Sequence, residues 1–495
     1  MQPRSFKITE KKKPVNTLVG VLTKPPTHDS RTTNNAIAHS TTGSKALDFF
    51  SQMGAARAWS AQQKIDLFLE AFDEDPLIAM QLLFWLRDAR GGAGERQSFK
   101  DIYAHLVNAN TESRFTEAMV RNMELIPKYG RWDDLWNNNA ITTDEVFNVV
   151  VELIKKGLAE GNGLLAKWLP RKGLQAVILR NALEMGPAEY RKLIVGLSTT
   201  VEQQMSAGNW EDIKFEHVPS VAMNKYRSAF YKRQEFRFSK YIEAVNKGEK
   251  KINASVLFPH LLYQAFNKGQ NEDAILAQWN AMPNYVADDE DYLPIIDVSG
   301  SMAGLPMDVA ISLGLYMAEK NKGAFKDFFV TFSAQPKFIH AEGNILTKFR
   351  SVRRAGAGFN TNIMAVFQQL LKLANGNRVQ AKDMPTKVII LSDMQFDGGA
   401  GVYQSHLQRD SWNTYLTNYE AIKAEYRKYG YTKPTVVFWN LRAVQGTQPI
   451  TQLDHGNIMV SGFSPTLLKD ILGNKRTSPT EAMLEVLAKY SDVIV

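Results

Sequence analysis

The sequence predicts an α + α/β fold class, with an all-helical half followed by an α/β half. From about residue 45 to residue 287, apolar residues recur at helical spacing, and strand-like alternation is nearly absent. From about residue 291, short apolar runs typical of buried strands alternate with helical patterns. Strands that alternate with helices indicate a mostly parallel sheet covered by helices on both faces. We therefore expect a doubly wound sheet in residues 291–495.

The helical half divides into successive amphipathic helices, and the turns between them contain Pro or Gly. Helix pairs of this length and spacing are typical of α-solenoids built from HEAT-like repeats, although the sequence shows no exact period. We expect a solenoid or ring over residues 46–287. The expected helices are residues 61–72, 76–87, 99–107, 144–158, 174–183 and 188–197.

The α/β half contains five apolar runs that predict strands, with helical patterns between them and at the end. The expected strands are residues 293–298, 327–331, 388–392, 435–439 and 458–460. The expected helices are residues 307–320, 362–374, 414–429, 465–471 and 480–489.

Residues 1–45 predict a flexible tail. The segment opens with a short basic run at Lys11, Lys12 and Lys13, and it is then dominated by Pro, Thr, Asn and Ser with little periodicity. Segments of this composition bury too little apolar surface to offset the entropy of ordering.

The composition is that of a globular protein able to form a full core. Hydrophobic residues make up 44% of the 495 residues and charged residues 22%. The absence of Cys fits a reducing cytosol, and we read neither a signal peptide nor an 18-residue apolar span, so we expect a cytoplasmic protein without a membrane partner. A net charge of +8 allows nucleic acid as a partner without requiring it.

One motif stands at the end of the first expected strand. The apolar run 293–296 is followed by Asp297, Ser299 and Ser301, an Asp-x-Ser-x-Ser pattern. Open α/β sheets place their ligands at the carboxyl ends of their strands. Oxygen ligands without His or Cys favour Mg²⁺ over zinc. The motif therefore predicts a magnesium site.

Two later segments extend this motif. A glycine-rich loop around residues 356–362 carries Thr361 and opens a helical pattern, and Asp393 follows the apolar run 387–392. Together, the order Asp-x-Ser-x-Ser, loop Thr and strand-terminal Asp resembles the metal-ion-dependent adhesion site of von Willebrand factor A (vWA) domains.

The vWA resemblance implies a role for each of these side chains. Ser299, Ser301 and Thr361 would bind Mg²⁺ directly, and Asp297 and Asp393 would hold metal-bound waters or touch the metal. Neutral hydroxyls leave the ion seeking an anionic ligand, which in the family is often a carboxylate of a partner protein. Many vWA domains have Asp after the loop Thr, whereas this chain has Asn362, which removes a negative charge near the site.

The helical half has a resemblance of its own. Residues 84–96, 126–135, 166–170 and 218–222, with a vWA-like half behind them, resemble uncharacterised phage, bacterial and plant relatives of the Ro 60-kDa autoantigen. That group pairs a ring of HEAT-like helices, the TROVE module, with a vWA domain. The resemblance implies a monomeric ring that binds small or misfolded RNA as a ribonucleoprotein and is not an enzyme.

Basic and aromatic residues alternate between positions 218 and 241. Basic side chains neutralise phosphates and aromatic faces stack on unpaired bases, although aromatics at helical spacing are also typical of a core. Arg171 and Lys172 are weaker candidates of the same kind. The RNA-binding candidates in the first segment are Lys225, Arg227, Lys232, Arg233, Arg237 and Lys240.

The glycine-rich segment 90–96 and the segment 129–134 are better explained as a tight turn between helices and a helix start, which leaves Arg90, Arg96 and Arg131 as further phosphate contacts. The eight His are scattered, and the chain has no Cys nucleophile. We therefore expect no enzyme. Two other hypotheses stay open: a scaffold that captures an acidic partner at the metal site without RNA, and a metal-dependent phosphoesterase using Asp397 as a base.

Overall fold

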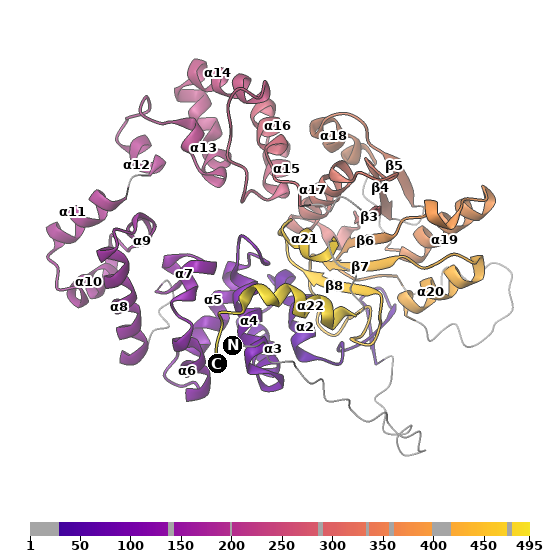
Figure 1. The fold of residues 1–495 in the computed structure, drawn as a ribbon, viewed down its shortest axis with the longest axis horizontal. Coiled ribbons are helices and arrows are strands. Elements are labelled where there is room, and N and C mark those ends of the chain that lie inside the picture. Colours follow the sequence, from indigo (N-terminus) through magenta and orange to yellow (C-terminus); the bar gives the residue numbers. More distant parts are fainter. Residues whose placement is uncertain are drawn as a thin grey trace, which may run out of the picture.

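The computed structural model describes residues 29–136, 143–198, 200–285, 291–332, 336–355, 361–397, 417–472 and 478–495. A helical half and a sheet half lie side by side, and the helices follow one another in an arc from α3 to α16 (Figure 1). The fold class is therefore α + α/β, as the sequence predicts. Within the described residues, no helix is both long and apolar enough to cross a bilayer.

All six helices expected in the first half are present, and their local signals explain their starts. Ser60 and Gln63 form a capping box at the start of α3, and Asp75 caps α4 with Pro76 in its first turn. The helices are α2 (Lys45–Gln52), α3 (Ala61–Glu74), α4 (Pro76–Arg87), α5 (Arg96–Leu106), α6 (Ser113–Arg121), α7 (Leu125–Tyr129), α8 (Asp144–Ala159), α9 (Gly163–Trp168), α10 (Gly173–Ala182), α11 (Pro187–Leu197), α12 (Val201–Ser206), α13 (Ser220–Arg233), α14 (Glu235–Asn246), α15 (Pro259–Asn267) and α16 (Glu272–Asn280).

A six-stranded sheet forms the second half. Its order is β5-β4-β3-β6-β7-β8, in which β5 is antiparallel and the other neighbouring pairs are parallel. This is the 3-2-1-4-5-6 order of doubly wound sheets, whose ligands bind where the order reverses. The strands are β3 (Tyr292–Asp297), β4 (Phe328–Phe332), β5 (Lys337–His340), β6 (Lys387–Ser392), β7 (Thr435–Asn440) and β8 (Asn457–Ser461).

The five expected strands are all present, and two elements were not expected. Strand β5 is a partly exposed edge strand without an apolar run, and α18 follows it in a basic segment. The expected start of α20 at residues 414–416 lies outside the described residues. The helices of this half are α17 (Leu305–Lys320), α18 (Ile345–Ala355), α19 (Ile363–Gly376), α20 (Asn418–Tyr429), α21 (Leu467–Leu472) and α22 (Pro479–Leu487).

The two faces of the sheet pack into different cores, because side chains along a strand alternate. Ile296, Leu391 and Trp439 belong to a core that they share with α17, α22 and most of the first half. Ile295 and Ile390 face the other way, into a core with α19 and α20. The first core therefore joins the helical half to the sheet half.

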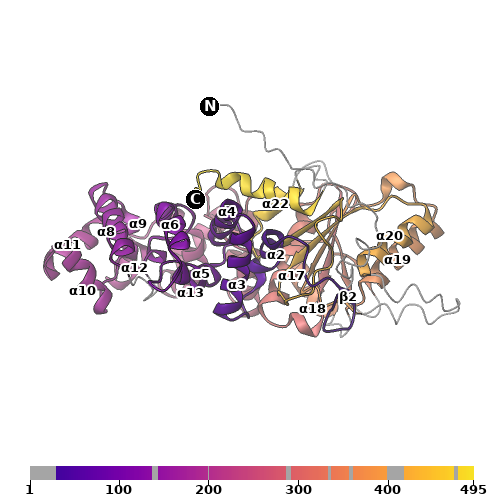
Figure 2. The same ribbon diagram turned by 90° about the horizontal axis from the view of Figure 1, so that it is seen from below.

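Both ends of the helical arc contact the sheet half. Helix α2 packs on β8 at one end, and α15 packs on α17 at the other. The helix α22 returns across α4 (Figures 1 and 2), where Tyr490 donates a hydrogen bond to Asp88 (3.1 Å). The arc is therefore tied to the sheet at its start and at its end.

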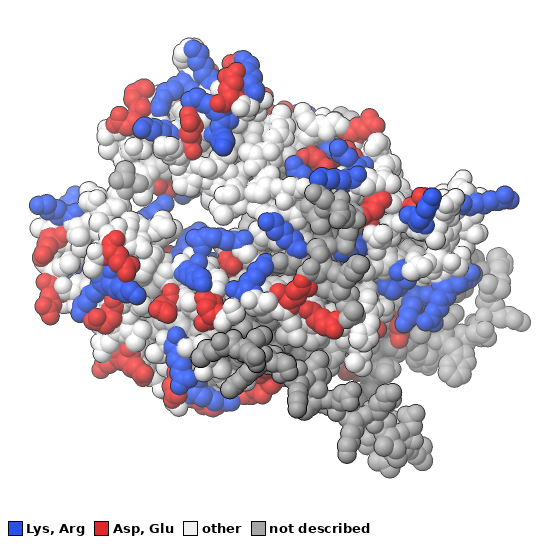
Figure 3. Space-filling model, in the orientation of Figure 1, with Lys and Arg blue, Asp and Glu red and all other residues white. Residues whose placement is uncertain are grey.

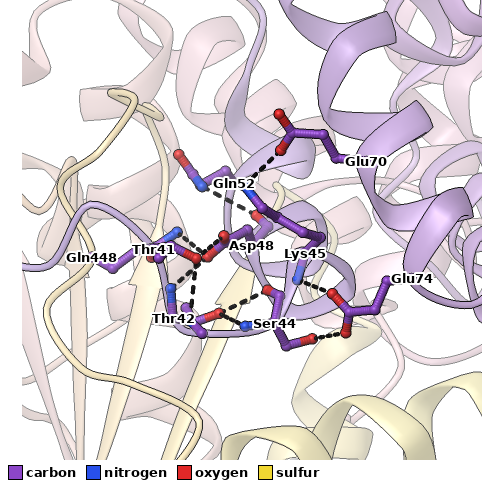
Figure 4. Close-up of polar contacts among 10 residues, drawn as sticks. Thr41, Thr42, Ser44, Lys45, Asp48, Gln52, Glu70, Glu74 and Gln448 are labelled. Carbon is purple, nitrogen blue, oxygen red and sulfur yellow. Dashed lines mark hydrogen bonds and ion pairs between the residues drawn. The ribbon is translucent and has the colours of Figure 1, made fainter. Parts of the chain in front are cut away.

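The predicted flexible tail is wrong for residues 29–45. Strands β1 (Ser30–Arg31) and β2 (Ile37–Ala38) pair with each other, and His39 pairs with Gln448 beyond β7. The buried carboxylate of Asp48 accepts hydrogen bonds from Thr41, from the backbone of Thr42 and from Gln448 (Figure 4). Partners about 400 residues away therefore order this segment, which its composition alone does not indicate.

The two motif segments of the first half meet in a buried ion-pair network. Asp134 is fully buried, and it pairs with Arg87 (2.6 Å) and with Arg96 (2.9 Å). Arg90 donates to the backbone oxygen of Lys128, and Arg131 lies over the Trp168 ring. All three arginines proposed as further phosphate contacts, Arg90, Arg96 and Arg131, therefore make contacts within the fold.

Candidate metal centre

The loop that leaves β3 carries the first three candidate ligands. Asp297 is the last residue of β3, and its Oδ1 accepts a hydrogen bond from the backbone N–H of Ser299 (2.9 Å). The Oγ atoms of Ser299 and Ser301 lie 3.0 Å apart. Asp297 and Ser299 are buried, whereas Ser301 is exposed. The loop therefore gathers a carboxylate and two hydroxyls at the end of the sheet's central strand.

Asp393 follows β6, the strand that pairs with β3. Its Oδ1 accepts from the backbone N–H of Gln395 (3.0 Å), and the Ser301 side chain hydrogen-bonds to it. Ser392, at the end of β6, donates to Oδ2 of Asp297 (2.6 Å). Neighbouring parallel strands end at the same edge, so the sheet itself brings the two carboxylates together.

Thr361 is held at the start of α19 by a second pair of contacts. Its backbone N–H donates to Oδ2 of Asp397 (2.8 Å), and its carbonyl oxygen accepts from the N–H of Asp397 (3.1 Å). Asn362 caps α19 by accepting from the N–H of Ala365 (3.0 Å). Asn362 is therefore the N-cap of α19. Asp397 places a carboxylate beside Thr361.

Asn34 connects Thr361 to the rest of the site. Its Nδ2 donates to Oγ1 of Thr361 (3.1 Å) and to the carbonyl oxygen of Gln395 (2.7 Å). Gln395 in turn holds Asp393 through its backbone N–H. Sequence reasoning missed Asn34, because it lies in a polar segment with no periodicity. No local signal could have found it.

The two carboxylates of the site resist ionisation. Burial, and secondly the charge of Asp393, raises the pKa of Asp297 to about 7. Burial also raises the pKa of Asp393, and the positive charge of Arg442 partly offsets this rise. Arg442 itself donates to the backbone oxygen of Ser301. Two desolvated carboxylates that oppose each other's ionisation favour a cation at this edge.

The donor set fits Mg²⁺ better than a transition metal. Within the described residues, no three His, Cys, Asp or Glu side chains cluster in the way that would hold a metal on their own. The ends of β3 and β6 offer two carboxylates and the hydroxyls of Ser299 and Ser301, which are hard oxygen donors. Thr361 is linked to them through Asn34 and Gln395. Mg²⁺ keeps several waters and needs only a few protein ligands, so such a mixed set suits it.

Two of the predicted RNA-binding residues on α13 and α14 have structural roles instead. Arg227 is buried, with Nε donating to the Asn224 backbone oxygen (3.2 Å), and burial lowers its pKa to about 10. Arg237 donates to the backbone oxygens of Trp210 and Ile213 and lies over the Phe215 ring. These contacts hold both guanidiniums against the fold.

The other four predicted residues of this segment are exposed. Lys225 and Lys240 lie over the rings of Tyr226 and Phe236, whereas Lys232 and Arg233 form no ion pair with any described residue. In Figure 3, acidic and basic side chains lie side by side over α13 and α14. Phe230 and Phe238 are buried in a separate core, as expected of aromatics at helical spacing. Arg171 and Lys172 lie elsewhere, beside α10 and α11.

The comparisons with known proteins divide the chain where its architecture changes. Residues 32–136 and 180–290 match a domain of unknown function, DUF2828, and residues 291–492 match another, DUF7788. An uncharacterized protein of Acanthamoeba polyphaga mimivirus, L728, is 30% identical over 516 residues, covering 93% of this chain and 87% of its own length. In this chain the DUF2828 match precedes the DUF7788 match. The chain belongs to the family of L728.

Proposed function

We propose that this protein binds a divalent cation at the carboxyl edge of its sheet and uses it to capture an acidic group of a partner, in the manner of vWA domains. The observation that carries the proposal is the meeting of Asp297, Ser299, Ser301 and Asp393 at the ends of β3 and β6. Ser299, Ser301 and Thr361 would hold the cation directly, with Asp297 and Asp393 around them. The cation would supply an electrophile for an anionic oxygen.

The exposure of the site supports a binding role. Ser301 is exposed while its neighbours are buried, so one side of the donor set opens to solvent. Hydroxyl ligands leave most of the charge of the ion uncompensated, which favours an anion from outside. An acidic residue of a partner is the simplest such ligand.

The test is direct measurement of cation binding. Titration calorimetry with Mg²⁺ and Mn²⁺ should give one saturable site, and Ser299→Ala with Ser301→Ala should weaken it about tenfold or more. Ser351→Ala, on α18, is the matched control and should bind as the natural chain does. Equal affinity in the double variant and the control would rule out these hydroxyls as ligands.

We propose RNA binding by the helical half as a second function, as in Ro-type proteins. A closed ring of HEAT-like helices would carry it, and the anchoring of both ends of the arc to the sheet half favours such a ring. Lys232 and Arg233 are exposed and form no ion pair among the described residues, so these two side chains are free to neutralise phosphates.

Lys232→Glu with Arg233→Glu should weaken RNA binding, because two phosphate contacts would become repulsive. The slope of log affinity against log salt should fall by about 2. Lys155→Glu with Lys156→Glu, on α8, makes the same change in net charge elsewhere and serves as the control. If the natural chain retains no RNA even at low salt, RNA binding is not its function, and the scaffold alternative remains.

A metal-dependent phosphoesterase is the third alternative. It would need a free base near the cation. Asp397 accepts the backbone N–H of Thr361, so this carboxylate is used to position the loop. Turnover of a generic phosphodiester that depends on both Mg²⁺ and Asp393 would establish catalysis.

A further inference from the structure

The geometry points to a binding site for a phosphate-bearing ligand of nucleotide size in a cavity beside α10 and α11. The cavity measures about 640 Å³, and Arg171, Lys172, Arg180 and Arg191 line it. Its remaining lining is Tyr190 and small or aliphatic side chains, with no carboxylate. This site is separate from the cation site and from the α13–α14 surface, and binding of a free nucleotide there rests on neither proposed function.

The four cations of this cavity lack acidic partners. None of them forms an ion pair with a carboxylate in the part of the chain that the structure describes. Like charges that line one cavity repel one another, and water screens part of this repulsion because Arg171, Lys172 and Arg191 are exposed. An anionic ligand would relieve this repulsion, because no carboxylate among the described residues pairs with these cations.

Arg180 is the most informative of the four. It is half-buried, and its Nε is buried without a hydrogen-bond partner in the described structure. A buried donor left unpaired costs free energy, so a ligand oxygen that accepts from this Nε would stabilise the complex. A guanidinium matches the oxygens of a phosphate in a two-pronged contact.

The walls of the cavity are held in place by contacts between its elements. The Tyr190 hydroxyl donates to the backbone oxygen of Pro170 (3.0 Å), which fixes α11 against the segment that carries Arg171. Arg171 donates through Nη2 to Oγ of Ser198 (3.2 Å), and Ser198 donates to the Ile194 backbone oxygen (2.7 Å). Binding there would therefore require little ordering of this side chain.

The mixture of charge and apolar lining identifies the ligand class. Ile194 and Val195 add apolar lining beside the cations, which suits a base or sugar better than an inorganic ion alone. Small-molecule pockets typically measure about 300–1,000 Å³, so the cavity admits a ligand such as a nucleoside monophosphate. The same chemistry is offered by a free nucleotide and by a nucleotide of a single RNA strand.

Three probes on the full chain separate these sources: inorganic phosphate, 5′-AMP and a ten-residue oligoadenylate, each followed by titration calorimetry. We expect saturable binding of 5′-AMP or of the oligoadenylate, tighter than that of phosphate. Saturable binding of 5′-AMP assigns the site to a free nucleotide. Binding of the oligoadenylate without binding of 5′-AMP assigns the site to an RNA strand. If neither 5′-AMP nor the oligoadenylate binds at millimolar concentration, the proposed site is wrong.

Arg180→Gln with Arg191→Gln should weaken the bound probe about tenfold or more, because charged hydrogen bonds to phosphate are lost. Arg191→Gln alone, at an exposed position, should give a smaller loss without disturbing the fold. Lys192→Gln, the next residue on α11 and outside the cavity lining, is the matched control for the single variant, and Lys192→Gln with Arg121→Gln matches the double variant.

An equal loss in the controls would assign the effect to net charge and contradict the site. Ser299→Ala with Ser301→Ala should leave probe binding unchanged, so that failure of the cation site and failure of this cavity can be told apart.

Discussion

At the residue scale, Asp134 shows how a motif that suggested phosphate contacts builds the fold instead. Its two oxygens accept from Arg87 and Arg96, and one also accepts from the backbone N–H of Arg131 (3.0 Å). Arg87 and Asp134 are both buried, so neither can turn to water if the other is removed. The pair therefore joins α4 and the start of α5 to the turn after α7.

Asp134→Ala should lower the free energy of unfolding by about 3–5 kcal/mol, because Arg87 is left charged and buried. Urea denaturation measures the loss. Asp66→Ala, an exposed carboxylate on α3, is the control and should change stability by less than about 0.5 kcal/mol. A loss for Asp134→Ala as small as that of the control would contradict the role of the network.

Spacing could have corrected the prediction for Arg227 and Arg237. Arg227 follows Met223 by four residues and precedes Phe230 by three, which places it on the buried face of α13. Arg237 precedes Tyr241 by four residues on α14. The alternation of basic and aromatic residues indicated RNA, whereas the helical period indicates that these two guanidiniums lie with the core.

At the element scale, the strands that carry the candidate metal site were predictable, whereas the segments that contact Thr361 were not. The apolar runs ending at Asp297 and Ser392 have the pattern of central parallel strands, which are buried on both faces. The edge strand β5 has no such pattern, because only one side of it is paired. The contact of Asn34 with Thr361 depends on partners more than 300 residues apart, which no local pattern encodes.

His260, on α15, contributes a pH dependence to the packing of α15 against the sheet half. It lies against Phe258 and Phe463, and its Nδ1 is buried without a partner in the described structure. Burial, and secondly Arg57, lowers the pKa of His260 to about 3. The folded state therefore favours the neutral ring, and its contribution to stability is present above pH 6.5 and is lost as the pH falls below 6.5.

Between pH 6.5 and pH 5, this group alone should cost the natural chain about 1.6 kcal/mol, with a slope that approaches about 1.4 kcal/mol per pH unit. His260→Phe should remove that slope, which urea denaturation at several pH values measures. His217→Gln, an exposed histidine, should keep it. Parallel curves for the natural chain and His260→Phe would show that His260 is protonated in the fold.

At the scale of the whole molecule, the helical half and the sheet half share a core. The face of the sheet that carries Ile296, Leu391 and Trp439 packs in one core with side chains of α2 and α4, such as Phe50 and Trp85. The boundary at residues 290 and 291 separates two patterns in the sequence, but it does not separate two independent cores. The sequence predicted the two halves correctly as fold classes, and their shared core depends on contacts between distant segments.

A fragment of residues 291–495 should therefore be less stable than the full chain, because it exposes the apolar side chains of β8 and α22 that α2 and α4 cover. Thermal unfolding should begin at a lower temperature, and the fragment should bind a hydrophobic dye that the full chain does not bind. A fragment that melts cooperatively at the temperature of the full chain without binding dye would show that the sheet half is independent.

The central claim is that Ser299, Ser301 and Thr361 hold one divalent cation beside Asp297 and Asp393. Anomalous diffraction from crystals grown with Mn²⁺ tests it most directly. The account predicts a single strong peak between the Oγ atoms of Ser299 and Ser301, at about 2.0–2.3 Å from each. Saturating Mn²⁺ with no peak at the ends of β3 and β6, or a peak bound by other residues, would contradict it.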